Sequence, residues 1–173
     1  MLLILLLCVS LCYSRIIVPR SPSIHVVGMS GHGKSTIARS LTNDNELISG
    51  NIETTTKRMA SFSKTFDMLI YDYPGFGSPE YSLRRWLREY KPRSIVLLVI
   101  GNRIYEQHKK FLQYFRRTRL IVVRSQMDIF PIDERIFKKY CRNTLQLKRN
   151  IPILFFNLKQ PLEFQRKLQG VIV

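Results

Sequence analysis

The hydrophobic positions of the chain follow two alternating patterns. Runs at residues 23–27, 66–71 and 94–100 are apolar almost throughout, which favours strands buried inside a sheet. Between such runs, apolar residues recur three and four positions apart, which predicts amphipathic helices. Further strands are predicted at 54–64 (a sheet edge), 120–123 and 151–156, and helices at 34–42, 83–90, 108–115, 132–145 and 161–168.

Strands and helices therefore alternate along the chain, which predicts βαβ units. We expect an α/β fold with a mostly parallel six-stranded sheet and helices on both faces. Ligands of such sheets bind at the carboxyl ends of the strands. The 173 residues suffice for one domain, which we assign to residues 15–173, after a separate leader at 1–14.

The leader at residues 1–14 is almost wholly apolar. It is shorter than the roughly 20 residues of a membrane-spanning helix. Three interpretations stay open: a signal peptide with Cys12 and Ser14 at the cleavage positions, a short uncleaved anchor, or a misassigned start of the coding sequence. A signal peptide predicts an endoplasmic reticulum or secreted protein, and the other two predict a cytoplasmic or membrane-associated one.

The chain is strongly basic, with 28 Lys and Arg against 12 Asp and Glu and a net charge of +16. This balance favours an anionic partner: nucleotide phosphates, an acidic lipid surface or nucleic acid. Many of the basic residues lie on predicted helices, and the aromatic residues sit at core spacing rather than between them. We therefore expect an anionic membrane as the partner, ahead of nucleic acid. Cys141 is predicted to be a buried apolar residue.

A glycine-rich segment, GMSGHGKS at residues 28–35, joins the first strand to the first helix and fits the pattern GxxxxGK[ST]. Its glycines let backbone N–H groups turn toward a phosphate, and the helix adds its positive end. Lys34 is expected to reach the β- and γ-phosphates, and the Ser35 hydroxyl to join a Mg²⁺ shell. An ordinary glycine-rich turn is the alternative. The predicted nucleotide-binding residues here are Gly28, Ser30, Gly31, Gly33, Lys34, Ser35 and Thr36.

Two further loops complete this predicted phosphate and metal site. Asp72 ends a strand and opens D-Y-P-G, so it is a candidate to hold Mg²⁺ while the Gly75 amide senses a γ-phosphate. A threonine at residues 54–56 is expected to complete the metal shell, with Thr55 favoured over Thr54, unless the segment is only a Thr-rich strand start. The predicted catalytic residues are Lys34, Thr55 and Gly75, and the metal ligands Ser35, Thr55 and Asp72.

Two further residues bear on recognition of the nucleotide base and on hydrolysis of the phosphate. Asp128 follows a strand where a loop should contact the base, and its carboxylate can accept two hydrogen bonds from guanine N1 and N2; a turn or helix-capping Asp is the alternative. Phe76 follows Gly75, where the Ras-like arrangement has a glutamine that orients the attacking water. We therefore expect slow intrinsic turnover.

With these motifs, residues 24–168 resemble the immunity-related (interferon-inducible) GTPases. The resemblance rests on GMSGHGKST, IETTTKR, YDYPGFGSPEY, LLVIGNRIYE, IVVRSQMD and ILFFN. It implies a P-loop NTPase with a Ras-like G domain, binding of GTP or GDP with Mg²⁺, and nucleotide-dependent self-association. It also implies that Asn157 flanks the base.

The chain departs from that family in three respects. Ser125 and Gln126 replace its Thr-Lys pair, so the lysine over the base is missing; the loop between Thr42 and Glu53 is short; and flanking helical segments are absent. We therefore expect a GTPase of weak, assembly-dependent activity. A degenerate, non-hydrolysing interaction module is the alternative, and a P-loop ATPase or kinase is a more distant one.

Overall fold

A computed structural model describes residues 22–42, 59–76, 82, 84–85, 88, 95–115 and 119–172. These residues contain a six-stranded sheet with the strand order β2-β3-β1-β4-β5-β6. All neighbouring strands are parallel except β2, which pairs antiparallel with β3 at one edge. The strands are β1 (Ser23–Gly28), β2 (Met59–Ser63), β3 (Met68–Asp72), β4 (Ile95–Ile100), β5 (Arg119–Arg124) and β6 (Ile153–Phe155). The helices are α2 (Lys34–Thr42), α4 (Glu106–Leu112), α5 (Glu134–Leu145) and α6 (Pro161–Ile172).

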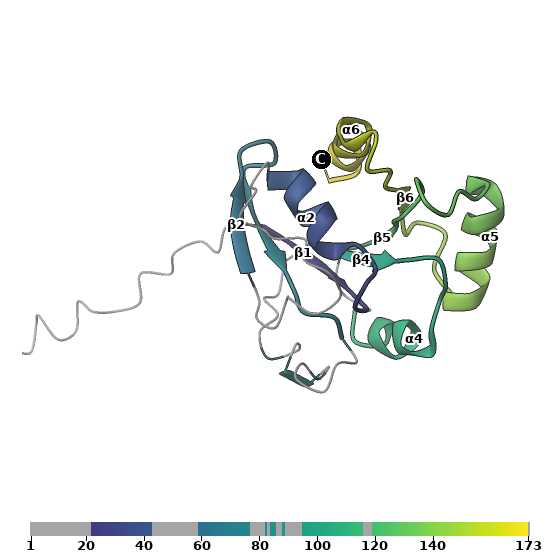
Figure 1. Ribbon diagram of the computed structural model, residues 1–173. Coiled ribbons are helices and arrows are strands. Elements are labelled where there is room, and N and C mark those ends of the chain that lie inside the picture. The colour runs from purple at the N-terminus through teal and green to yellow at the C-terminus, as the bar shows by residue number, and fades with distance from the viewer. Residues whose placement is uncertain are drawn as a thin grey trace, which may run out of the picture.

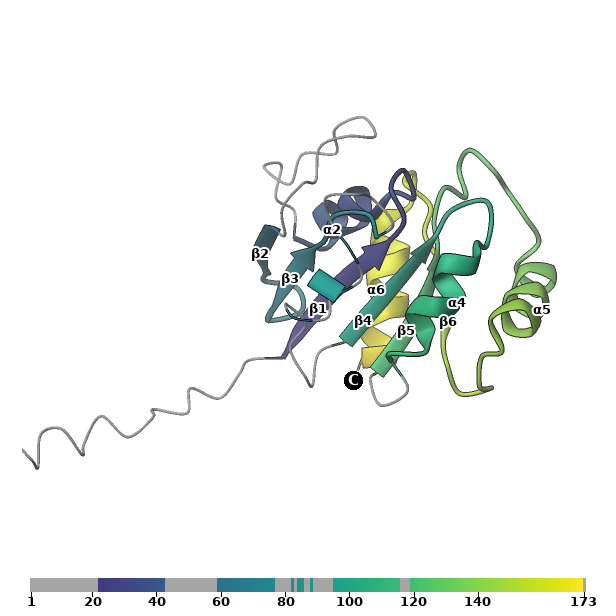
Figure 2. The ribbon, with the colours of Figure 1, turned by 90° about the horizontal axis from the view of Figure 1, so that it is seen from below.

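Helices cover both faces of the sheet, as Figures 1 and 2 show: α2 and α6 lie on one face, α4 and α5 on the other. Successive strand residues point to opposite faces, so Val26 and Leu97 pack in the core under α2 and α6. Their neighbours Val27 and Leu98 pack in the core under α4 and α5. The continuously apolar central strands are thereby explained, because both of their faces are buried.

The predicted α/β architecture is confirmed, and most elements lie within two residues of their predicted bounds. Strand β3 begins at Met68 instead of residue 66 because Asp67 adopts a left-handed φ of 52° in the turn before it. Helix α6 continues to Ile172, four residues past its predicted end. The helix predicted at 83–90 lies mostly outside the described residues, although Arg84, Arg85 and Arg88 are helical.

Cys141 is fully buried in the core under α4 and α5, as predicted. Burial raises the pKa of its thiol to about 12, so the thiol stays protonated and unreactive at neutral pH. Within the described part of the chain, no helix is both long and apolar enough to cross a membrane.

The strand register brings the predicted motifs to one edge of the sheet. Gly28 at the end of β1 pairs with Val99 of β4, and Val26 pairs with Asp72 at the end of β3. Figure 2 shows the loops after β1, β4 and β5 together at the edge where these arrowheads end. The carboxyl edge expected to hold the ligand is therefore the edge that carries the candidate residues.

Candidate nucleotide-binding site

The loop between β1 and α2 requires glycine at particular positions. Gly28, Gly31 and Gly33 have φ values of 155°, 74° and 79°, which residues with a Cβ rarely adopt. A Cβ on Gly28 would also collide with the carbonyl oxygen of Val99 on the neighbouring strand. The motif thus forms a left-handed loop that leads directly into α2, whose first N–H groups lack partners within the helix.

Lys34 is the first residue of α2, and its side chain folds back over the loop. Its Nζ donates a hydrogen bond of 3.0 Å to the carbonyl oxygen of Met29. The side chain is 6% exposed, and this burial lowers its pKa to about 8, partly offset by the Asp72 carboxylate. The ammonium therefore lies inside the loop, where it would lie beside a bound phosphate.

Ser35 and Asp72 meet across the site. The Ser35 hydroxyl donates a 2.6 Å hydrogen bond to Oδ2 of Asp72, which is 2% exposed. Oδ1 of Asp72 is buried and has no hydrogen-bond partner in the described structure. Burial raises the pKa of this carboxyl group, and the bond from Ser35 and the charge of Lys34 oppose the rise. A buried carboxylate with one unused oxygen beside a hydroxyl matches the oxygen ligands that Mg²⁺ prefers.

Gly75 packs directly on the loop that carries Ser30. A Cβ on Gly75 would lie 2.8 Å from the Cα of Ser30, so no side chain fits there. The next amide, of Phe76, donates a 3.2 Å hydrogen bond to the carbonyl oxygen of Gly28. The segment after β3 is therefore joined to the glycine-rich loop by backbone contact.

The ring of Phe76 points into the core beneath α4. It is 5% exposed, stacks on Phe111 with ring centroids 4.7 Å apart, and meets the His108 ring edge-on at 5.7 Å. An apolar side chain held in this way offers no hydrogen-bonding group to a water molecule in the site. Among the described residues, the position after Gly75 therefore supplies no counterpart of the water-orienting glutamine.

The loop after β5 contacts the glycine-rich loop through its first two residues. The Ser125 hydroxyl donates to the carbonyl oxygen of His32 at 2.6 Å, and the Gln126 Nε2 donates to that of Gly31 at 2.9 Å. Gln126 adopts a left-handed φ of 58°. The glutamine that replaces the expected lysine therefore still joins this loop to the phosphate loop.

Asp128 and Asn157, the two residues predicted to contact the base, lie on adjacent loops. The amide of Met127 donates to the carbonyl oxygen of Phe156 at 3.4 Å, which places the two loops side by side. Asp128 is half-buried. The Asn157 Oδ1 accepts a 2.9 Å bond from the Lys159 amide, so this side chain also shapes its own loop.

The other predicted site residues are placed as follows. Thr36 is half-buried in the first turn of α2. Thr55 and Thr54, predicted for the metal shell, lie outside the described residues. The structure thus brings together the glycine-rich loop, Asp72, Gly75 and the loops that carry Asp128 and Asn157.

A buried arginine, Arg124, supports the base loop and was not predicted. Its guanidinium donates to the carbonyl oxygens of Ser125 at 2.6 Å and Phe130 at 3.1 Å, and lies 5.5 Å from the Phe137 ring. Burial lowers its pKa. In the sequence, the one signal for this buried role is the position of Arg124 directly after the apolar run at 120–123. The same position also fits an exposed residue at a strand end.

A pair of buried histidines behind the glycine-rich loop was also not predicted. The His32 and His108 rings stack at 5.4 Å, and His32 Nδ1 accepts a 3.1 Å bond from the Gly101 amide. His108 Nδ1 accepts from the Tyr105 amide at 2.9 Å, while its buried Nε2 has no partner in the described structure. Burial, with mutual repulsion for His32, lowers both pKa values to about 4, so both rings are neutral at pH 7.

The fold and these loops define a GTP-binding G domain of the P-loop class. The chain belongs to the 50S ribosome-binding GTPase family, whose model matches residues 23–127. That match includes the glycine-rich loop, Asp72 and Gly75, and it ends one residue before Asp128. A comparison of the sequence with curated proteins gave no match.

Solved structures show the same fold. A probable GTP-binding protein engB superposes with a TM-score of 0.61 and 16% identity, over 87% of this chain and 98% of that one. NFeoB from S. thermophilus, bound to GDP.AlF4- and K+, superposes with a TM-score of 0.61 and 16% identity, over 87% of this chain and 61% of that one. The G235P variant of SsGBP superposes with a TM-score of 0.58 and 19% identity, over 88% of this chain and 55% of that one. The chain thus spans nearly all of engB but less than two thirds of the other two proteins.

Proposed function

We propose that this chain binds GTP and GDP together with Mg²⁺ and hydrolyses GTP slowly. The observation that carries the proposal is the hydrogen bond of 2.6 Å from half-buried Ser35 to buried Asp72, beside Lys34 at the start of α2. A hydroxyl, a carboxylate and an ammonium converge there on a loop of left-handed glycines. The charges and hydrogen-bonding groups of a nucleotide's phosphates and its metal ion match this set.

In this proposal, Ser35 and Asp72 would hold Mg²⁺, with Thr55, which precedes β2 in the sequence, as a third ligand. Mg²⁺ held there would supply positive charge to the phosphates of the nucleotide. Lys34 releases the Met29 carbonyl and binds the β- and γ-phosphates. The glycine-rich loop and Thr36 surround the α- and β-phosphates, and Gly75 senses the γ-phosphate through its amide.

Guanine selectivity is assigned to Asp128, whose carboxylate accepts hydrogen bonds from N1 and N2 of the base. Adenine has no donors at these positions. The proposal is supported by the place of Asp128 beside the Asn157 loop, and by the Gln126 bond that fixes the base loop to Gly31. Asn157 lies where it would flank the base from the other side.

Slow turnover is inferred from Phe76, whose packing on Phe111 leaves the attacking water without an orienting group at that position. The resemblance to immunity-related GTPases suggests that a second copy supplies this group on self-association. We therefore infer that GTP hydrolysis depends on assembly.

Hydrolysis at increasing protein concentration tests this proposal. Phosphate release from GTP with Mg²⁺ should be slow per molecule at low concentration and should rise with concentration, and Lys34→Ala should abolish it. A rate per molecule that stays constant over a hundredfold range would contradict the assembly step. Tight GTP binding with no turnover at any concentration would instead favour a non-hydrolysing interaction module.

A further inference from the structure

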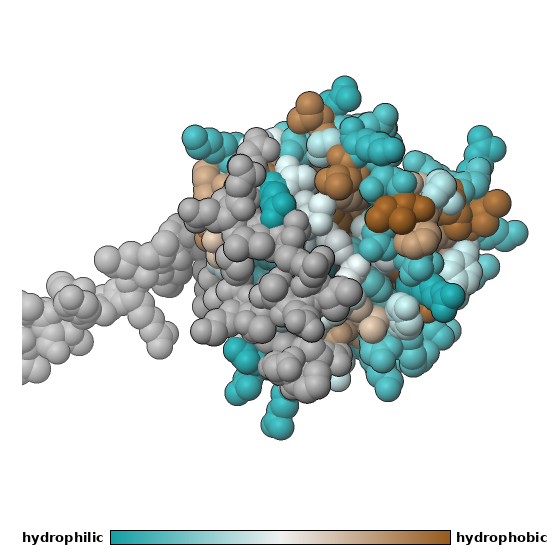
Figure 3. Space-filling view, viewed as in Figure 1, coloured by the Kyte–Doolittle hydropathy of each residue, from teal (hydrophilic) through white to brown (hydrophobic). Residues whose placement is uncertain are grey.

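A group of large apolar side chains is exposed on and just before α5. Ile129 and Ile136 are 62% and 64% exposed, and Phe130 and Tyr140 are 46% and 49% exposed. Figure 3 shows brown side chains among teal ones on the side of the molecule formed by α5. Exposed apolar groups that cluster within twelve residues are candidates for a contact surface.

These side chains form one surface because the turn at residues 126–130 is fixed beside α5. Helix α5 buries Phe137, Cys141 and Leu145 against the sheet, so Ile136 and Tyr140 face outward. Arg124 donates to the carbonyl oxygen of Phe130 and lies over the Phe137 ring, which holds the turn next to the first half of the helix.

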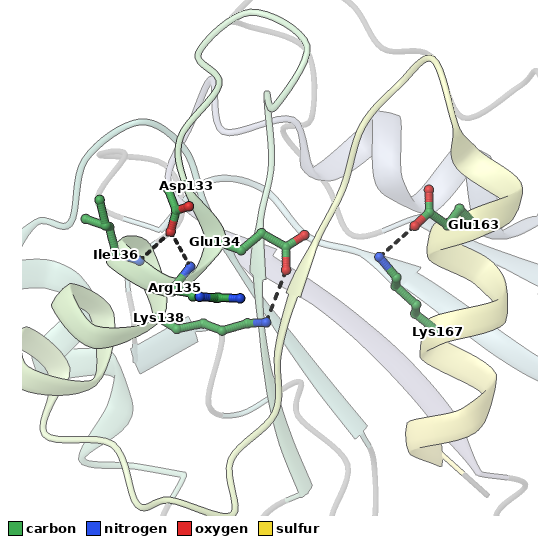
Figure 4. Close-up of polar contacts among 7 residues, drawn as sticks. All are labelled: Asp133, Glu134, Arg135, Ile136, Lys138, Glu163 and Lys167. Carbon is green, nitrogen blue, oxygen red and sulfur yellow. Dashed lines mark hydrogen bonds and ion pairs between the residues drawn. The ribbon is translucent and has the colours of Figure 1, made fainter.

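Exposed basic residues accompany these apolar groups on α5 and on the loop after it. Arg135 and Lys139 lie on the outer side of α5, and Lys148 and Arg149 lie on the loop that follows it. Of the three neighbouring acidic side chains, Figure 4 shows the two at the start of α5, Asp133 and Glu134; the third, Asp128, directly precedes Ile129. Asp133 accepts from the amides of Arg135 and Ile136 at 2.8 and 3.0 Å, and Glu134 pairs with Lys138 at 3.1 Å. With Glu134 paired to Lys138, the four basic side chains outnumber Asp128 and Asp133, so the surface is net positive as well as apolar.

We propose that this α5 surface, made of Ile129, Phe130, Ile136, Tyr140 and the basic residues Arg135, Lys139, Lys148 and Arg149, docks on an anionic phospholipid bilayer. Apolar side chains gain free energy by entering the headgroup region, and lysine and arginine are attracted to anionic lipids. Two of the four apolar side chains are aliphatic, which gain little from nucleic acid, where base stacking needs aromatic rings. The surface is formed by α5 and the segments on either side of it, and it begins directly after Asp128.

Flotation of the whole chain with phospholipid vesicles tests the proposal. Vesicles of phosphatidylcholine with 30% phosphatidylserine should bind the protein, and the double variant Arg135→Glu/Lys139→Glu should bind at least about tenfold more weakly. Ile136→Ser, at an exposed position, should weaken binding several-fold. The control Lys64→Glu/Arg166→Glu makes the same change in net charge at exposed positions on other elements, and it should bind much better than the α5 variant.

Because the apolar leader at 1–14 is common to all these chains, a second measurement reports on α5 directly. Ile136→Cys is labelled with an environment-sensitive dye in a chain carrying Cys8→Ser and Cys12→Ser, where buried Cys141 does not react. Blue-shifted emission on anionic vesicles, absent on neutral ones, is expected. Emission that does not change on vesicles that carry the protein would overturn the proposal. So would equal binding by both double variants, or an α5 charge effect seen with single-stranded RNA but not with vesicles.

Discussion

The hydroxyl of Ser35 and the carboxylate of Asp72, 37 positions apart in the sequence, are joined by a 2.6 Å hydrogen bond at the carboxyl edge of the sheet. The bond uses one carboxylate oxygen and leaves the other buried without a partner in the described structure. A buried carboxylate oxygen without a hydrogen-bond partner destabilises a protein. Its presence at the start of α2 indicates that the site is built for a ligand rather than for stability.

Replacing Asp72 should therefore separate stability from ligand binding. Asp72→Asn removes the buried charge, so the melting temperature of the nucleotide-free protein should stay the same or rise. The increase in GTP affinity on adding Mg²⁺ should fall at least tenfold, because the carboxylate that we assign to the metal is gone. Calorimetric titrations of GTP with Mg²⁺ and with a chelator measure this difference. An unchanged Mg²⁺ effect would contradict the assignment of Asp72.

The contact between Gly75 and Ser30 predicts a strong effect from one methyl group. Gly75→Ala places a Cβ 2.8 Å from the Cα of Ser30, where backbone cannot move without disturbing the glycine-rich loop. We expect a loss of about 1–3 kcal/mol in the free energy of unfolding and weaker nucleotide binding. The matched control is Gly170→Ala in α6, where a Cβ meets no atom within 4 Å. That change should be neutral or stabilising by up to about 1 kcal/mol.

The buried histidines predict an acid-sensitive fold. Burial lowers the folded-state pKa of His32 and His108 from 6.5 to about 4, so the unfolded chain takes up their protons first. Their contribution is complete above pH 6.5 and is lost as the pH falls toward 4, by about 2 kcal/mol for each histidine at pH 5. Urea unfolding at pH 7.5 and pH 5 measures the loss.

A histidine variant provides the control for that measurement. His108→Gln retains a side chain that can reach the Tyr105 amide but does not titrate, so it should remove about half of the loss between these two pH values. The same pH dependence in His32→Val/His108→Gln as in the unchanged protein would show that other groups cause it.

Gln126 predicts a gain from restoring a lysine. Its amide donates to the Gly31 carbonyl, but it lacks the charge and the long aliphatic stem with which lysine packs over a base. Gln126→Lys should increase GDP affinity several-fold, and Gln126→Ala should decrease it because the bond to the glycine-rich loop is lost. Dissociation of a fluorescent GDP measures both. Equal release from all three proteins would place Gln126 away from the bound nucleotide.

The sequence predicted those parts of the site that depend on local signals. The glycine-rich motif and the helical spacing of Ile37, Ala38 and Leu41 gave α2 with its observed bounds, because one motif and one buried face determine that helix. Asp72 was singled out because it ends an apolar run, and Asp128 because it lies in the loop that follows one. Parallel strands place such loops at one edge of the sheet without further information.

The parts that were missed depend on contacts between distant residues. Gln126 and Gly31 are 95 positions apart, and nothing local to either residue indicates their bond. The stacking of His32 on His108 arises only once β4 lies next to β1. Arg124 appeared to be an ordinary strand end, because its buried role depends on the Phe137 ring from α5.

Competition between guanine and adenine nucleotides tests the central claim most directly. Residues 15–173 with Mg²⁺ are titrated with fluorescent GDP and GTP, and unlabelled GTP or ATP is added. We predict micromolar or tighter binding, displaced by GTP but not by ATP, and abolished in Lys34→Ala. Failure of a folded protein to bind either base, or equal displacement by ATP, would contradict the account of a guanine-nucleotide site formed by the glycine-rich loop, Asp72 and Asp128.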